Sequence, residues 1–415
     1  MHLIRGLNVA RKESGQVLIM YAFFLPVLLL FVGLGIDFGF GLLTKNRLAK
    51  AADAASLAVM LNLGQGDSQA RAIGQSVFAL NINTGSKLYV SPPIPNININ
   101  HSGTEPVVDV SATATIRTFF IGLAGFHTLN VGGHSQATRP PVILSLVLDK
   151  SGSMKLNGGS TALPPSVTTF LGYFIEGTDQ LGEVSFSTIA TPDVAISKTF
   201  HTPINNFVNG MPFGGATFAQ GGLLDAQGQV TGVSSPPPNA VQVVVFFTDG
   251  WANTVSDTLG GSLVNFGGCA PAEFDVGWCG AISCMNPTTG SQISSTAVSS
   301  TTTAAKCNGV GTFTAQDTVD LTNPASLTIQ NIATEADYRA IQLANTMRTQ
   351  GITVYSIGLG DKINTTYLQE LANDPASPVY NPNEPSGLAE FAPTSSDLNT
   401  AFQTVAAKIL LRLTQ

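Results

Sequence analysis

Charged side chains are scarce in this sequence. Only 11% of its 415 residues are Asp, Glu, Lys or Arg, whereas 44% are apolar. Such a composition is sparse in charge for a cytosolic protein and favours an envelope or secreted one. The net charge of −7 and the lack of a basic stripe argue against binding to phosphates, so no nucleic-acid partner is expected.

Cysteine and histidine are also few. The four cysteines lie in one 39-residue window that contains no histidine: Cys269, Cys279, Cys284 and Cys307. Their spacing matches no zinc module and favours two disulfides in an oxidising compartment, with three possible pairings; free thiols in a cytosolic domain are the alternative. The five histidines are scattered, with no partner at metal-ligand or catalytic-triad spacing, and they predict no enzymatic site: His2, His101, His127, His134 and His201.

One long segment has no charge at all. Between Glu13 and Asp37 lie 23 uncharged residues, including VLIMYAFFLPVLLLFVGLGI, which are enough to cross a hydrocarbon core as a helix. A buried core helix is one alternative. A signal peptide cleaved at the AKA sequence of residues 49–51 is another, but that sequence lies about 15 residues beyond the apolar run, too far for ordinary processing. We therefore expect a tail at 1–13 and a retained transmembrane helix at 14–36.

The orientation of this helix does not follow from its flanking charges, because three basic residues precede the span and three follow it. Residues 1–53 carry a net charge of +3, which leaves −10 for the remainder and fits a membrane anchor followed by a solvated ectodomain. Disulfides would place the cysteines outside the cytoplasm. The sequence thus predicts a cytoplasmic tail and a single-pass protein of the inner or cytoplasmic membrane with a large extracytoplasmic part.

A helical pattern continues beyond the span through TKNRLAKAADAASLAVMLNL. A seam of mostly small residues at helical spacing would pack either against the next segment of this chain or against a partner helix: Ala51, Ala54, Ala55, Ala58 and Leu61. Residues 67–80 predict a second helix, and NININ and PVVDVSATATIRTFF alternate as strands do. Residues 37–139 are therefore expected to form an extracytoplasmic α+β segment with a pilin-like plan.

This N-terminal region resembles the TadE/TadG-type proteins of Flp (tight adherence) pilus assembly. The resemblance covers residues 10 to 75 and rests on the Gly-Gln opening, on Asp37 at the end of the span, and on the Ala-Ala-Asp-Ala-Ala block around Asp53. Processed pilin-like subunits usually carry Glu five residues after the cleavage glycine, and that position, counted from Gly15, is Met20 here. The departure favours a stable TadG-like membrane anchor over a cleaved pilus subunit.

A second domain is expected at 140–413, after a linker at 138–141. Strands predicted at VILSLVLD, GEVSFST, VQVVVFFTD and ITVYSIGLG alternate with helices near residues 164–177, 216–229, 334–351 and 396–413. The continuous apolar strands indicate an α/β doubly wound, Rossmann-like sheet with helices on both faces. Residues 251–330 interrupt this alternation and predict an insertion that carries all the cysteines and is pinned by disulfides.

Five oxygen-bearing side chains follow the strands of this predicted sheet: Asp149, Ser151, Ser153, Thr217 and Asp249. The carboxyl ends of neighbouring parallel strands converge at a switch point, where ligands bind. Carboxylates, hydroxyls and water are the ligands that Mg²⁺ prefers. The sequence therefore predicts a metal site, with Mg²⁺ as the cation and Mn²⁺ or Ca²⁺ as alternatives; simple capping of the following helix is the other interpretation of the Asp and Ser residues.

The same five residues resemble the metal-ion-dependent adhesion site of von Willebrand factor A domains, over residues 142 to 412. Asp149, Ser151 and Ser153 match the DxSxS motif of that family, Thr217 matches its threonine loop, and Asp249 matches the aspartate of its TDG sequence. The oversized insertion after Asp249 departs from the family pattern. The resemblance implies a cation that accepts an acidic side chain from a partner protein.

The two resemblances together predict a membrane-anchored pilus-assembly or adhesion protein that is not an enzyme. Its expected partners are a protein with an acidic side chain, other pilus-assembly proteins or pilins, and the membrane. A metal-dependent hydrolase is an alternative, although no base, nucleophile or arginine clamp accompanies the predicted site. A structural envelope component with a fold-stabilising cation is the other alternative.

Overall fold

The structure of the chain is a computed structural model, which describes residues 14–82, 88–259, 262–267, 281–285, 289, 292–297, 329–361 and 363–412. It divides into two compact units. The first unit takes Met1–Met60, Ser68–Ile99 and Val107–Ala137, and the second takes Leu61–Asp67, Asn100–Pro106 and Thr138–Gln415. Each unit is described by itself.

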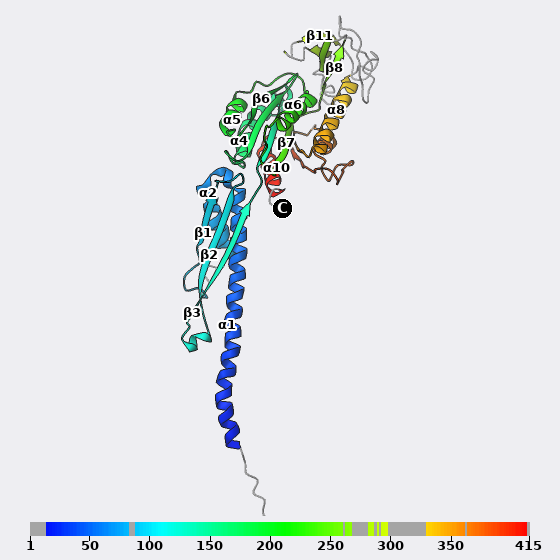
Figure 1. Ribbon diagram of the computed structural model, residues 1–415. Helices are drawn as coiled ribbons and strands as arrows, with labels where there is room; N and C mark the ends of the chain where they lie inside the picture. The colour runs from blue at the N-terminus through cyan, green and yellow to red at the C-terminus, as the bar shows by residue number, and fades with distance from the viewer. Residues whose placement is uncertain are drawn as a thin grey trace, which may run out of the picture. The chain divides into compact units, whose positions relative to one another are not determined.

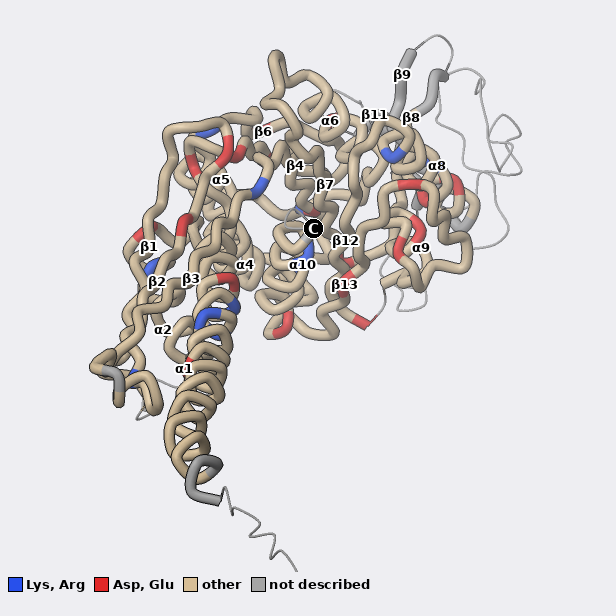
Figure 2. Tube along the Cα trace, turned by 60° about the horizontal axis from the view of Figure 1, so that its bottom comes forward, with Lys and Arg blue, Asp and Glu red and all other residues tan. Residues whose placement is uncertain are grey.

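A single helix dominates the first unit. Helix α1, Ser14–Leu61, has 48 residues, so the apolar span and the predicted helix after it are continuous. From Leu18 to Leu34 nearly every large apolar side chain is exposed, and the helix is long and apolar enough to cross a membrane. Figure 2 shows that the charged residues of α1 gather in the half of the helix remote from its start.

The rest of the first unit packs against α1 from Gly33 onward. Helix α2, Asp67–Asn81, is followed by a three-stranded sheet in the order β1-β2-β3, with β1 at Pro95–Asn100, β2 at Val107–Arg117 and β3 at Thr128–Thr138. The small residues of α1 permit close approach: Ala51 and Ala55 are fully buried, and a Cβ added at Gly133 of β3 would lie 2.6 Å from the Ala49 nitrogen. Two residues of the predicted small-residue seam, Ala51 and Ala55, are thus buried within the chain itself.

The second unit contains the predicted sheet. Its strand order is β13-β12-β7-β4-β5-β6, with β4 at Val142–Asp149, β5 at Gln180–Phe186, β6 at Ala190–Ser197, β7 at Val241–Thr248, β12 at Thr353–Leu359 and β13 at Ala389–Ala392. All neighbours are parallel except the edge strand β6, which is antiparallel to β5. This is the expected α/β class, since every residue of β4 is buried as a central parallel strand requires.

Helices cover both faces of this sheet. One face packs against α6 (Ala219–Thr231), α8 (Ile329–Thr349) and α9 (Thr365–Ala372). The other packs against α3 (Ser153–Leu156), α4 (Gly159–Leu171), α5 (His201–Gly210) and α10 (Leu398–Arg412). Successive residues of β4 alternate between the two cores, with Val147 on the first face and Leu146 and Leu148 on the second. The sheet is therefore rigidly held beneath the loops at its ends (Figure 1).

The insertion after β7 contains strands that the sequence analysis missed. Strands β8 (Thr254–Leu259), β9 (Ser262–Gly267), β10 (Ala281–Met285) and β11 (Gln292–Ala297) form an antiparallel sheet in the order β11-β10-β9-β8. Cys269, Cys279 and Cys307 lie outside the described residues, as does the side chain of Cys284. The two disulfides stay a prediction.

The expected linker at 138–141 is part of the second unit. Arg139 is fully buried and forms a two-pronged ion pair with Asp179, at 2.9 Å from Nη1 to Oδ1 and 2.6 Å from Nη2 to Oδ2. The Asp179 carboxylate also accepts the main-chain N–H groups of Val142, at 2.9 Å, and Ile175, at 2.7 Å. Within the expected linker, Arg139 thus joins the start of β4 to the loop before β5 through Asp179.

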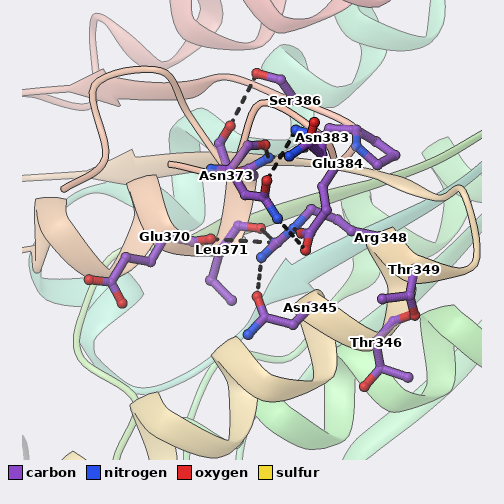
Figure 3. Close-up of polar contacts among 12 residues, drawn as sticks. Asn345, Thr346, Arg348, Thr349, Glu370, Leu371, Asn373, Asn383, Glu384 and Ser386 are labelled. Atoms are coloured by element: carbon purple, nitrogen blue, oxygen red, sulfur yellow. Dashed lines mark hydrogen bonds and ion pairs between the residues drawn. The ribbon is translucent and has the colours of Figure 1, made fainter. Parts of the chain in front are cut away.

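A second buried arginine fixes the loops near β13. Arg348, at the end of α8, pairs with Glu384 at 2.9 Å and donates to the carbonyl oxygen of Leu371 at 2.7 Å (Figure 3). Asn373, which has a left-handed φ of 48°, exchanges two hydrogen bonds of 2.8 Å with the main chain of Asn381. These contacts hold the segment between α9 and β13 against the end of α8.

Candidate metal site

The candidate site lies at the carboxyl ends of the two central strands. Asp149 is the last residue of β4, and Asp249 directly follows β7, which pairs with β4 in parallel. Because parallel neighbours end at the same edge of the sheet, the two carboxylates are brought together from positions 100 residues apart. Ser151 lies in the loop after β4, and Ser153 begins α3.

A continuous chain of hydrogen bonds joins four of the five predicted residues. The Ser151 and Ser153 hydroxyl oxygens are 2.9 Å apart, and Ser153 Oγ donates to Asp249 Oδ1 over 2.7 Å. The Ser151 main-chain N–H donates to Asp149 Oδ1, also over 2.7 Å. Asp149, Ser151, Ser153 and Asp249 therefore form one compact cluster of oxygen atoms.

Thr217 reaches this region on a separate loop. Its N–H donates to Asn253 Oδ1 at 2.7 Å, and the Asn253 N–H donates back to the Thr217 carbonyl at 3.1 Å. Two further main-chain bonds join the Thr217 loop to the loop after β4, from Gly214 to Lys150 at 2.7 Å and from Gly152 to Gly215 at 3.0 Å. These main-chain bonds hold the Thr217 loop beside the loop that carries Ser151.

Burial dominates the electrostatics of the cluster. Asp149 is fully buried and Asp249 is 3% exposed. Burial raises the pKa of Asp149 to about 6, although hydrogen bonds from the hydroxyl of Thr248 and from Ser151 work in the opposite direction. The groups that lower this pKa are neutral donors and offset only part of the cost of burying the charge. A cation beside the two carboxylates would offset more of it.

The donor set fits a hard divalent cation. Two carboxylates and three hydroxyls supply only oxygen, which suits Mg²⁺, Mn²⁺ or Ca²⁺ better than metals that favour nitrogen or sulfur. In the part of the chain that the structure describes, no group of three or more His, Cys, Asp and Glu side chains is placed to hold a metal. A cation here would therefore depend on Ser and Thr hydroxyls and on water.

Three residues of the site region were not predicted from the sequence. Thr248 donates to Asp149 Oδ2 at 2.6 Å, Asn157 Nδ2 donates to Asp249 Oδ2 at 3.0 Å, and Asn253 holds the Thr217 loop. Thr248 directly precedes Asp249, so its nearness to the site was visible in the sequence. Asn157 lies one helical turn beyond Ser153, which is a weaker indication that it is near the site. Nothing in the sequence indicated that Asn253 is near the site.

Comparison with known proteins gives a family match at the N-terminus. Residues 15–65 match the family model described as putative Flp pilus-assembly TadE/G-like. No curated protein matches the chain.

Solved structures similar to the chain include von Willebrand factor A domains. Proximal thread matrix protein 1 from the mussel byssus, with a zinc-occupied MIDAS motif, is 14% identical, with a TM-score of 0.37 over 66% of this chain and 46% of its own. The von Willebrand factor domain of the type V pili tip protein Mfa5 from Porphyromonas gingivalis is 16% identical, with a TM-score of 0.42 over 67% of this chain and 97% of its own. A von Willebrand factor type A protein from Catenulispora acidiphila is 12% identical, with a TM-score of 0.37 over 78% of this chain and 51% of its own.

The chain thus spans less than half the length of the mussel protein. The sequence resemblance at the N-terminus is confirmed by the family model over nearly all of the apolar span and the rest of α1. Residues 15–65 of this chain are therefore similar to the TadE/G-like family of Flp pilus assembly.

Proposed function

We propose that the second unit is a von Willebrand factor A-type binding module whose Asp149, Ser151, Ser153, Thr217 and Asp249 hold Mg²⁺. The observation that carries this proposal is the unbroken chain of hydrogen bonds from Asp149 to Asp249 through the two serines. Helix capping alone would not require the second aspartate, which comes from a different strand. Mn²⁺ or Ca²⁺ would suit the same oxygen donors.

The partner is proposed to be a protein that offers an acidic side chain. A divalent cation held by two carboxylates and neutral hydroxyls keeps positions for water, and a carboxylate from outside can replace such a water. In a Tad-type setting, the partner would be another pilus-assembly protein, a pilin or a surface receptor. The module would then act in assembly or adhesion and not as an enzyme.

The proposed topology places residues 1–13 in the cytoplasm, α1 across the inner or cytoplasmic membrane, and the second unit outside. Impermeant thiol labelling of reporter cysteines placed at exposed positions of the second unit, such as Ser234, tests this in intact spheroplasts. Labelling is expected; protection of these sites until the membrane is broken would reverse the topology.

Acetate tests the acidic ligand, because its carboxylate stands for an Asp or Glu side chain. The full chain in detergent is loaded with paramagnetic Mn²⁺, and the broadening of the acetate methyl signal is followed by NMR. Strong broadening is expected for the natural sequence and its loss for Asp149→Asn. The matched control is Asp53→Asn, an exposed aspartate of α1, which should behave as the natural sequence does.

Two other results would contradict the proposal. Bound Mn²⁺ without broadening of acetate beyond that caused by the free ion would make the cation structural only. Turnover of a generic phosphodiester that is lost in Asp149→Asn would make the protein a hydrolase.

A further inference from the structure

The loop that joins β2 to β3 in the first unit is strongly apolar. Residues 118–126, TFFIGLAGF, contain no charged side chain and include the short helix η2, Ile121–Ala124. We name residues 118–127 the tip loop. Leu123 is 86% exposed, Phe126 67% and Phe119 57%. Large apolar side chains gathered on a loop mark a surface that contacts something other than water.

The tip loop lies beside α1 at the end of the uncharged span (Figure 1). A Cβ added at Gly33 would lie 2.3 Å from the Phe120 Cβ, so the side chain of Phe120 packs directly against this glycine. The Phe119 and Phe40 rings pack with their centroids 5.7 Å apart. About 20 apolar residues cross a hydrocarbon core, and a span that begins at Val17 would reach its far side near Ile36, level with these contacts.

Asp37 fixes the tip loop to the helix. Its carboxylate accepts three successive main-chain N–H groups, from Phe119 at 2.9 Å, Phe120 at 2.8 Å and Ile121 at 2.7 Å. Asp37 is only 2% exposed. A carboxylate at the end of an apolar span is costly without partners, and here the tip loop provides them.

Other main-chain groups of the tip loop are also paired. The N–H groups of Thr118, Leu123, Gly125 and Phe126 donate to carbonyl oxygens within the loop, at 3.1 to 3.2 Å. A loop that enters a lipid environment must satisfy its backbone internally, since lipid offers no hydrogen bonds. The tip loop combines an apolar surface with a backbone that is largely paired.

We propose that the tip loop is a second membrane contact, inserted into the interfacial region of the outer leaflet beside α1. The apolar surface of the loop continues that of the span, and the carboxylate of Asp37 between them is buried. Exposed charged side chains follow beyond the loop, at Arg117 of β2 and Lys45 of α1, where they can reach lipid headgroups. A loop in this position prevents the first unit from tilting freely about a single helix.

Tryptophan quenching in lipid tests the proposal on the full chain reconstituted in nanodiscs. Leu123→Trp is the test variant, and Leu80→Trp on α2 is its matched control, since both leucines are 86% exposed in the same unit. Phe31→Trp, in the exposed part of α1, is the positive control. Emission is compared in lipids with and without brominated chains, after subtraction of the signal from the native Trp251 and Trp278.

Loss of emission is expected for Phe31→Trp and Leu123→Trp in brominated lipid, with none for Leu80→Trp. Adding Asp37→Ala to Leu123→Trp should reduce the loss, because the tip loop is then released from α1. Quenching of Phe31→Trp without quenching of Leu123→Trp would overturn the proposal, and a blue-shifted, unquenched Leu123→Trp would mean that a protein covers the loop. An unquenched Phe31→Trp would show that α1 itself does not lie in the bilayer, and the proposed membrane contact of the tip loop would then be wrong as well.

Discussion

The Thr248 hydroxyl donates a 2.6 Å hydrogen bond to Oδ2 of Asp149 across the pair formed by β4 and β7. The opposite oxygen, Oδ1, accepts the Ser151 N–H. Asp149 is thus fixed from both sides before any cation arrives, which lowers the cost of ordering the carboxylate on binding.

Thr248→Val should weaken Mg²⁺ binding by about 10- to 100-fold, the usual effect of removing a group that orients a metal ligand. Calorimetric titration of the full chain in detergent measures the change. Thr353→Val is the matched control, because Thr353 is a buried threonine at the opposite end of the sheet. Unchanged affinity for Thr248→Val would mean that Asp149 needs no orientation.

Gly215→Ala should distort the Thr217 loop. Gly215 has a φ of +92°, and a Cβ there would lie 2.6 Å from Thr188 Oγ1, so the substitution is strained by about 1–3 kcal/mol. Weaker Mg²⁺ binding together with a lower free energy of unfolding is expected. Gly210→Ala, where nothing lies within 4 Å of the added Cβ, should change neither quantity. If the two variants had the same Mg²⁺ affinity and the same stability, the turn at Gly215 would not be needed to position the Thr217 loop.

Asp179→Ala should destabilise the second unit by about 3–5 kcal/mol, because it leaves the buried Arg139 charge and two main-chain donors without their acceptor. Urea unfolding followed by tryptophan fluorescence gives the free energy of unfolding. Lys198→Met, at an exposed cation, should fall within about 0.5 kcal/mol of the natural sequence. A comparably small change for Asp179→Ala would show that Arg139 does not depend on this pair.

Glu183 should make stability depend on pH. It is fully buried in β5, and burial with the nearby negative charge of Asp193, opposed by Lys150, raises its pKa from 4.5 to about 9. Between these values the folded chain keeps a proton that the unfolded chain has released, so the folded state loses stability as pH rises.

Glu183→Gln removes this titration. The free energy of unfolding of the variant, relative to the natural sequence, should therefore rise with pH by up to about 1.4 kcal/mol per unit. Urea unfolding at several values between pH 5.5 and 7.5 measures the trend. Parallel pH profiles for the two proteins would contradict the raised pKa.

The positions of Asp149 and Asp249 were predictable because each follows an apolar strand, and the carboxyl ends of parallel strands meet. The strand β3 was not predictable, since TLNVGGHSQAT is polar and has glycines at its centre. The main chain of α1 passes close to Gly133, which leaves no room for a side chain there. The contact between Asp37 and the tip loop was also hidden. It joins residues more than 80 positions apart and uses main-chain N–H groups, which any sequence supplies.

The central claim is that Asp149, the two serines, Thr217 and Asp249 hold one divalent cation. Calorimetric titration of the full chain with Mg²⁺, alongside Asp149→Asn, Asp249→Asn and the control Asp53→Asn, tests it most directly, with circular dichroism to show that each variant is folded. One Mg²⁺ per chain is predicted, with affinity lowered at least about tenfold in the two site variants and unchanged in the control. Equal affinity in a folded Asp149→Asn protein would contradict the account.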